Sequence, residues 1–220
     1  SGDPEWAAKV TLSDLMCHTA LNMHYVKGFE RSRGLPSVER LLQEPAAFGY
    51  EPVAVLSNPG SVFHYSGGGF LVLQHLIETI EKQPADNFMR SFLHRLGCEE
   101  LSFSNDPAGS VPHADGYLDS GNVVPGGRFD FPGFAAGASG SARAVLRFLR
   151  HIEVAFHSLQ GSSLISHDTA VTMMRGRDLG ARAFMGCDMG VGVFVAEMGD
   201  NRVAIHQAVS YTHLRAHETL

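Results

Sequence analysis

The sequence has few cysteines, few lysines and no long hydrophobic run. Its three cysteines (Cys17, Cys98 and Cys187) are too few and too widely spaced for a disulfide framework or a close metal pair, so we interpret them as free or buried thiols. No apolar stretch reaches the roughly 18 residues that a bilayer span needs, which predicts no membrane segment in this chain. The first residues contain neither an initiator Met nor the basic region of a signal peptide, so we expect a fragment of a longer protein.

Common metal and nucleotide motifs are also missing. The 12 histidines form no H-E-x-x-H or H-x-H pair, so we predict no metal site. The sequence has no Walker loop, no G-x-G-x-x-G and no G-x-S-x-G nucleophile elbow. A glycine triplet at residues 67–69 has two interpretations, a phosphate cradle at a helix N-terminus or a packing feature. Because no lysine follows the triplet, we favour packing.

What is present is an acidic chain of intermediate hydrophobicity. Of its 220 residues 44% are hydrophobic, which suffices for one domain with a core or for two small ones. Asp and Glu number 23 against 17 Lys and Arg, which gives a formal charge of −6. This balance argues against a nucleic acid or an anionic membrane surface as the partner.

Hydrophobic periodicity and capping residues predict several helices. The clearest spans Phe70–Ile80, where apolar residues cover nearly all sides, so we expect a central, buried helix. A capping box of Thr11 and Asp14 predicts a short helix after Thr11, and Ser37 begins a helix with Val38, Leu41 and Leu42 on its inner side. Further helices are expected at Pro84–Leu96, with Gly97 after it, at Ser141–Ile152 and at Ser166–Met174.

Two regions are expected to be non-helical. Residues 104–137 are rich in Gly, Pro and Asp and predict a long ordered loop, which in a compact domain is usually functional. Met189–Glu197 and Arg202–Gln207 have strand patterns around a hairpin turn at residues 198–201. Because so few strands cannot form an independent sheet, we expect their partners to lie outside this sequence.

Four segments resemble, in order and spacing, the serine β-lactamase and penicillin-binding-protein superfamily in its class C and esterase branch. Residues 59–70 (PGSVFHYSGGGF) resemble the segment P-G-x-x-F-x-Y-S-N-x-G-Y, which leads into a buried helix. Residues 10–20 (VTLSDLMCHTA) resemble the segment of this superfamily that ends in H-T-S-G-L. Residues 134–148 (FAAGASGSARAVLRF) resemble the segment that contains S-T-A-x-D-L-A-R-F. Residues 189–193 (MGVGV) and 205–207 (IHQ) resemble the last strands, which carry a Lys/His-x-Gly motif.

The resemblance implies an α+β, β-lactamase/transpeptidase-like fold, in which helices flank an antiparallel sheet and a helical lobe completes the domain. The nucleophile of this superfamily lies in an S-x-x-K helix, but none of the three lysines here has a serine three residues before it. We therefore expect the N-terminal strands and the nucleophile helix to be missing from this chain.

The resemblance also implies site residues. Tyr65 matches the tyrosine that passes a proton between the nucleophilic serine and the leaving group, a role that suits a phenol beside a lysine ammonium. Gly67 stands where class C β-lactamases have an Asn that contacts the lactam side chain, which counts against lactam recognition. His206 occupies the Lys/His position, where it would bind a substrate carboxylate or orient the tyrosine. An ordinary tyrosine at a helix start and a solvent-facing strand histidine are the alternatives.

We accordingly expect a fragment of a serine hydrolase that acts through an acyl-enzyme on esters, amides, D-amino-acid peptides or β-lactams. Its partner would be a small-molecule or peptide substrate, and no cofactor is implied. Without the Ser–Lys pair the chain as given should be inactive. A non-catalytic, penicillin-binding-protein-like relative that binds peptide or peptidoglycan is the alternative, and an unrelated helical binding domain is a third possibility.

The C-terminal residues have a separate origin in our interpretation. Residues 209–219 (VSYTHLRAHET) resemble the conceptual translation of a transposase adapter used in sequencing libraries. We therefore divide the chain into a partial hydrolase domain, residues 1–208, and a non-native tail, residues 209–220. A natural polar tail is the alternative.

Overall fold

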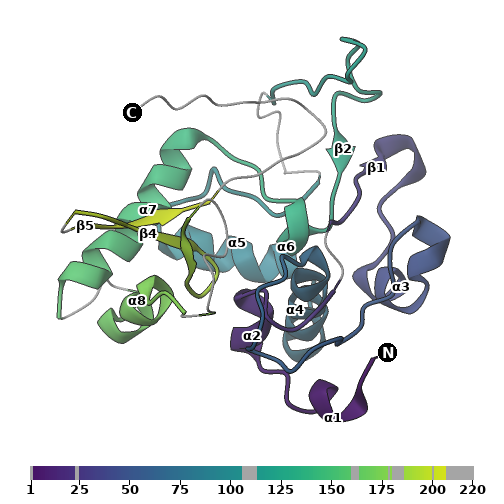
Figure 1. Ribbon diagram of the computed structural model, residues 1–220. Coiled ribbons are helices and arrows are strands. Elements are labelled where there is room, and N and C mark those ends of the chain that lie inside the picture. Colours follow the sequence, from purple (N-terminus) through teal and green to yellow (C-terminus); the bar gives the residue numbers. More distant parts are fainter. Residues whose placement is uncertain are drawn as a thin grey trace.

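The computed structural model (Figure 1) describes residues 2–22, 25–105, 113–159, 164–177, 179, 186–199 and 201–206. The helices are α1 Pro4–Ala7, α2 Leu12–Met16, α3 Val38–Gln43, α4 Gly67–Glu81, α5 Ala85–Arg95, α6 Gly133–Ala136, α7 Ala142–His157 and α8 His167–Met174, with short 3-10 helices η1 Arg31–Arg33 and η2 Pro45–Phe48. The strands are β1 Phe29–Glu30, β2 Phe129–Asp130, β3 Asp188–Met189, β4 Phe194–Met198 and β5 Asn201–Ile205. The expected tail, residues 209–220, lies outside the described residues, so its origin stays a prediction.

Polar N-caps begin most of the helices that the sequence predicts, whereas α5 follows Pro84 without a side-chain cap. Thr11 and Asp14 form the expected capping box at α2, each side chain accepting a hydrogen bond from the other residue's backbone N–H. Ser37, Ser141 and Ser166 each accept from the backbone N–H three residues on, at the start of α3, α7 and α8. Each such cap contributes about 1 kcal/mol because it satisfies a donor that the first helical turn leaves unpaired. All the predicted helices are present, and α7 extends beyond its predicted end.

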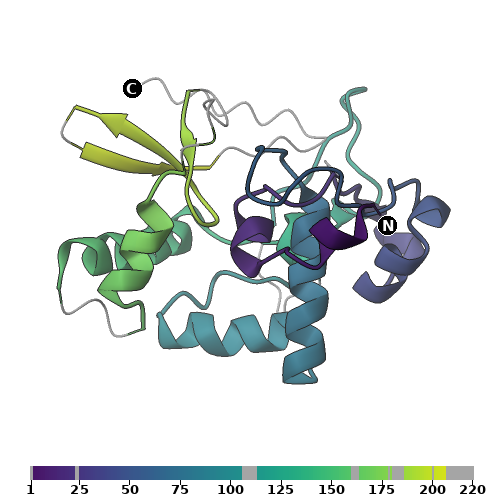
Figure 2. The ribbon, with the colours of Figure 1, turned by 60° about the horizontal axis from the view of Figure 1, so that its bottom comes forward.

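Helix α4 is central, as predicted, but it is not buried along its whole length. It packs against α2, α3, α5 and α6, so neighbours cover several of its faces. Leu71 and Gln74 are buried, whereas Ile80 in the last turn is 62% exposed. In Figure 2 the lower end of α4 projects past α5. The expectation of a helix buried throughout is therefore wrong for its C-terminal turn, because the helix runs beyond the elements packed against it.

The strands form two small antiparallel sheets. β1 pairs with β2, and β4 lies between β3 and β5. The predicted hairpin is confirmed, since Met198 pairs with Asn201 across a turn in which Gly199 has a φ of +62°. The predicted strand Met189–Glu197 is wrong as one continuous strand, because residues 190–193 form a bend that separates β3 from β4. Gly192 in that bend has a φ of +77°, which interrupts a strand and favours glycine.

Residues 104–137 are only in part the loop that the sequence predicts. β2 lies within this segment and pairs with β1, Phe29 opposite Asp130. α6 also lies within it and packs on α4, where the backbone N–H of Phe134 donates to Oε1 of Gln74 at 3.1 Å. A two-residue strand and a one-turn helix are too short to leave a periodic pattern, so composition alone could not show them.

The described residues form an α+β structure in which two groups of elements meet. Helices α7 and α8 lie with the β4–β5 hairpin on one side, and α1–α4 lie on the other (Figures 1 and 2). Leu93 and Leu96, at the end of α5, form a buried cluster against which Phe148 of α7 packs. Because α5 also packs against α4, it joins the two groups. A second junction, between α2, the start of α4 and the last strands, holds the residues that the sequence singles out.

Candidate functional site

Tyr65 lies at the junction between a loop and the N-terminus of α4. Residues 58–60 make the predicted turn, with Gly60 at a φ of +81°, and lead into the segment that carries Tyr65. Ser66, which is 1% exposed, caps α4: its Oγ accepts the backbone N–H of Gly69 at 3.1 Å. A buried cap at the next residue fixes the direction in which the backbone leaves Tyr65. The half-buried tyrosine side chain therefore projects from a rigid position.

His18 holds the backbone on both sides of Tyr65. Its carbonyl oxygen accepts the N–H of His64 at 2.7 Å, and its ring Nδ1 accepts the N–H of Ser66 at 3.0 Å. The ring of His18 also lies against that of Tyr65, with centroids 4.3 Å apart and planes at 31°. His18 is 4% exposed and has a φ of +57°, a left-handed conformation in which histidine is over-represented among non-glycine residues.

Further hydrogen bonds fasten the Tyr65 segment to the residues that follow His18. The N–H of Gly60 donates to the carbonyl of Thr19 at 2.9 Å, and Nε2 of His64 lies 3.1 Å from the carbonyl oxygen of Asn22. The side chain of Asn22 is itself fixed, since its Oδ1 accepts the N–H of Ala54 at 2.7 Å. Two of the four segments that carry the family resemblance thus lie side by side.

A buried cluster joins Tyr65 to the last strands. The cluster consists of Cys17, Cys187, Met189 and Phe194, with Phe63 and Tyr65 among the residues packed against it. The ring of Phe194 contacts those of Phe63 and His206, with centroids 6.0 Å apart in each pair. The structure therefore brings the three predicted site residues, Tyr65, Gly67 and His206, into one region.

Gly67 is buried at the first position of α4, and Gly69 of the same triplet serves close packing. A Cβ on Gly69 would lie 3.3 Å from the carbonyl oxygen of Leu15, so the glycine lets α4 approach α2 closely. The N–H of Gly69 is already taken by the Ser66 cap. This arrangement supports the packing interpretation of the triplet over a phosphate cradle.

Burial changes the proton affinity of Tyr65 and His206, the two titratable residues among the predicted site residues. Burial raises the pKa of Tyr65, and the phenol of Tyr25, whose ring centroid is 6.2 Å away, raises it further. At neutral pH the Tyr65 hydroxyl is therefore protonated and able to donate. Desolvation lowers the pKa of the His206 imidazole, which is therefore neutral at pH 7.

An ion pair ties α2 to the segment before β3. Nη1 of Arg177 lies 3.3 Å from Oδ1 of Asp14, and its other amino group donates to the hydroxyl of Ser13. The backbone N–H of Arg177 donates to the carbonyl of Met189 in β3 at 2.9 Å. Burial alone would raise the pKa of Asp14, but hydrogen bonds from Thr11 and Arg177 outweigh it and lower the pKa. The pair thus holds α2 against the strand that contributes to the cluster.

His18 contacts the Tyr65 segment, although the sequence alone assigns it no role. It stands in the H-T segment of the resemblance, far before Tyr65 in the chain. The one available signal is its place just after the short capped helix α2, where a residue in the left-handed conformation often ends a helix. That it bonds to both neighbours of Tyr65 follows from the tertiary structure.

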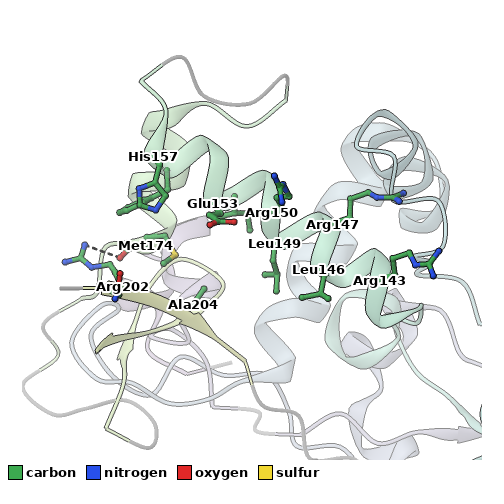
Figure 3. A pocket seen from close by; sticks show the side chains of 13 residues that line it. Arg143, Leu146, Arg147, Leu149, Arg150, Glu153, His157, Met174, Arg202 and Ala204 are labelled. Carbon is green, nitrogen blue, oxygen red and sulfur yellow. Dashed lines mark hydrogen bonds between the residues drawn. The ribbon is translucent and has the colours of Figure 1, made fainter. Parts of the chain in front are cut away.

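A cavity of about 690 Å³ lies between α7 and the β4–β5 hairpin (Figure 3). Leu146 and Leu149 of α7 line one side, and Arg202, which donates to the carbonyl of Met174 at 3.5 Å, lines the other. None of the three predicted site residues lines it, so this cavity is separate from the Tyr65 region.

The described residues show neither a metal site nor a membrane helix. Among them no group of three His, Cys, Asp or Glu side chains is placed to hold a metal ion. In the same residues no helix combines the length and hydropathy that crossing a bilayer requires. The three cysteines are buried and form no disulfide bond, and burial raises the pKa of Cys17 and Cys98.

Comparison with known families gives one match over nearly the whole chain. A family model described as Beta-lactamase matches residues 2–216. No curated protein sequence matches the chain.

Solved structures share this fold at low sequence identity. A D-amino acid amidase from Ochrobactrum anthropi SV3, complexed with D-phenylalanine, has a TM-score of 0.66 and 16% identity over 93% of this chain and 59% of that one. A D-stereospecific amidohydrolase from Streptomyces sp. has a TM-score of 0.64 and 16% identity over 90% of this chain and 60% of that one. A penicillin-binding protein from Bacillus halodurans has a TM-score of 0.61 and 16% identity over 86% of this chain and 57% of that one. The predicted β-lactamase/transpeptidase-like α+β fold is confirmed, and the chain spans about three fifths of the length of these structures.

Proposed function

The chain belongs to the beta-lactamase family, a family of serine-hydrolase-like proteins, and we propose that it forms part of an enzyme. This enzyme would cleave amide or ester bonds through an acyl-enzyme. The observation that supports this most is the fixed placement of Tyr65. The backbone on either side of Tyr65 is bonded to His18, and its ring packs against the cluster that includes the last strands. Proton transfer depends on such fixed geometry.

In the proposed cycle a serine hydroxyl attacks the substrate carbonyl carbon while Tyr65 takes the hydroxyl proton. Tyr65 then gives that proton to the leaving amine or alcohol as the C–N or C–O bond breaks, and water hydrolyses the acyl-enzyme. Because burial raises the pKa of Tyr65, the donating step suits the phenol as it stands, whereas the accepting step needs a nearby cation. The serine and the cation would come from an S-x-x-K pair, which these 220 residues do not contain. We place that pair in the remainder of a longer protein.

For the substrate we propose amides and esters of D-amino acids or short peptides. Two of the structures that share the fold are named as a D-amino acid amidase and a D-stereospecific amidohydrolase. Gly67 has no side chain with which to contact a β-lactam amide, which favours simpler acyl groups. His206, neutral at pH 7 and packed on Phe194, would donate a hydrogen bond to a carboxylate or carbonyl oxygen of the substrate.

A non-catalytic relative that binds peptide or peptidoglycan is the second candidate. The observations that favour it are the absence of S-x-x-K from these residues and the glycine at position 67. Such a protein would keep the fold and the apolar cluster around Tyr65 but would form no covalent intermediate.

Trapping the acyl-enzyme separates the two candidates. The longer protein that contains this chain is mixed with an ester of D-phenylalanine, quenched in acid and weighed by intact-protein mass spectrometry. A hydrolase gains the mass of the acyl group on a serine outside residues 1–220, and Tyr65→Phe slows the gain. Reversible binding of the ester with no gain in mass would contradict the proposed hydrolase and favour the binding protein.

A further inference from the structure

One residue, His18, contacts the Tyr65 segment at three points. Its carbonyl oxygen accepts the N–H of the residue before Tyr65, its Nδ1 accepts the N–H of the residue after it, and its ring faces the tyrosine ring. We infer that His18 is a positioning residue, which sets the place of the Tyr65 hydroxyl by clamping the backbone on both sides of it. The inference rests on the proposed function of Tyr65.

The hydrogen bond to Nδ1 specifies the chemical form of His18. A ring nitrogen that accepts a hydrogen bond carries no proton, so the imidazole is neutral and its proton is on Nε2. A proton on Nδ1 would set two donors against each other, because the backbone N–H of Ser66 can only donate. The same N–H belongs to the residue that caps α4, so the bond holds the start of the helix together with Tyr65.

His18 is itself held firmly enough to serve as a clamp. It follows α2, whose start is fixed by the capping box and by the ion pair between Asp14 and Arg177. Gly69 lets α4 pack closely on the Leu15 carbonyl of the same helix. The left-handed backbone at His18 then turns the chain so that the carbonyl and the ring reach the same segment.

Two substitutions, His18→Gly and His18→Asn, distinguish the contribution of the His18 side chain from that of its backbone. Gly and Asn both tolerate a φ of +57° better than other residues do. Asn carries an acceptor, Oδ1, close to the place of Nδ1, whereas Gly carries none. His151→Asn is the matched control, because it removes a ring nitrogen that lies 2.9 Å from the Leu96 carbonyl oxygen, away from Tyr65.

The first measurement is amide hydrogen exchange by NMR on the 220-residue chain. His18→Gly should speed exchange at Ser66 roughly tenfold relative to Leu71 in the same helix, because one buried hydrogen bond is lost. His18→Asn should restore most of the protection, and His151→Asn should leave it unchanged. Equal exchange at Ser66 in the wild type and both His18 variants would overturn the inference.

If His18→Gly does not fold, the His18→Asn variant still tests whether His18 positions Tyr65. It keeps the acceptor but loses the ring that lies against Tyr65, so the ring resonances of Tyr65, assigned with Tyr65→Phe, should shift while Ser66 exchange stays slow. Unshifted Tyr65 resonances, or rapid Ser66 exchange, would overturn the inference.

The second measurement is a double-mutant cycle on an amino acid ester with the longer protein. His18→Gly should lower kcat on the order of tenfold with KM nearly unchanged, and His18→Asn should recover part of the loss. In a Tyr65→Phe background His18→Gly should have no further effect on kcat. An equal loss in both backgrounds would make His18 merely structural. If Tyr65→Phe alone has no effect, the proposed function fails, and the exchange experiment still decides whether His18 positions Tyr65.

Discussion

Nη1 of Arg177 lies 3.3 Å from Oδ1 of Asp14, although the two residues are 163 positions apart in the sequence. The pair connects α2, near the start of the chain, with the segment that leads into β3. The cluster around Cys17 and Phe194 makes a second connection between the same parts. The surroundings of Tyr65 are thus built from both ends of the described chain, and their integrity depends on long-range contacts.

Stability should fall at acid pH through Asp14. Hydrogen bonds from Thr11 and Arg177 lower its pKa in the folded state from the ordinary value of 3.8, so the unfolded chain binds the proton more readily. The stabilisation is fully present above that value and is lost as pH falls through the folded pKa. In urea denaturation from pH 7 to pH 3, Asp14→Asn should lose less stability on acidification than the wild type. Parallel pH profiles for the two proteins would contradict this account.

The same substitution has a matched control at neutral pH. Asp14→Asn should cost about 1–3 kcal/mol, because it weakens charge-assisted bonds of a buried group. Asp86→Asn, which weakens the surface pair with Arg90 on α5, should cost less than about 1 kcal/mol.

Leu41→Ala should destabilise the chain far more than Leu146→Ala. Leu41 is 0% exposed in the cluster formed with Val38, Tyr50 and Leu71, so its truncation leaves a cavity and should cost about 2–5 kcal/mol. Leu146 on α7 is 66% exposed, and its truncation should change stability by no more than about 0.5 kcal/mol. Similar costs for the two variants in urea denaturation would show that the core lies elsewhere.

The sequence predicts the helices well because their signals are local. Thr11 and Ser37 mark helix starts by caps that act within one turn, and Gly97, with a φ of +65°, marks the end of α5. The family resemblance predicts Tyr65 and His206 as site residues, and in the structure both lie at the cluster around Phe194.

What the sequence does not predict depends on tertiary contacts. The exposure of Ile80 follows from which elements pack on α4, and an apolar pattern does not specify its neighbours. The pairing of β1 with β2 involves two residues on each strand, too few for periodicity. The clamp formed by His18 needs the Tyr65 segment beside it, so no property of residues 10–20 alone reveals it.

The 220-residue chain should hydrolyse neither a chromogenic ester nor a cephalosporin above the buffer rate. It contains no S-x-x-K, so it lacks the proposed acylating pair even though Tyr65 is in place. Absorbance assays at micromolar protein would detect the activity of an intact enzyme. A burst of product from the purified chain would show that another residue of this chain is the nucleophile.

Gly67→Asn should change substrate preference in the longer protein. An Asn amide at the start of α4 supplies the hydrogen-bonding group that class C β-lactamases have in the resembling motif, and it lies two residues from Tyr65. The ratio of cephalosporin to ester turnover should rise relative to the wild type. Gly67→Ala is the control, because it adds a side chain without an amide. An equal ratio in both variants would show that the missing amide does not limit lactam recognition.

The most direct test of the central claim is the effect of Tyr65→Phe on kcat/KM for one amino acid ester in the longer protein. The substitution removes one oxygen and keeps the ring that packs on His18, so the thermal midpoint should change little. Loss of the proton shuttle should lower kcat/KM on the order of 10²–10⁴-fold, and His206→Ala should lower it less, mainly through KM. Values for wild type and Tyr65→Phe within a factor of about three, with both proteins folded, would contradict the catalytic role of Tyr65.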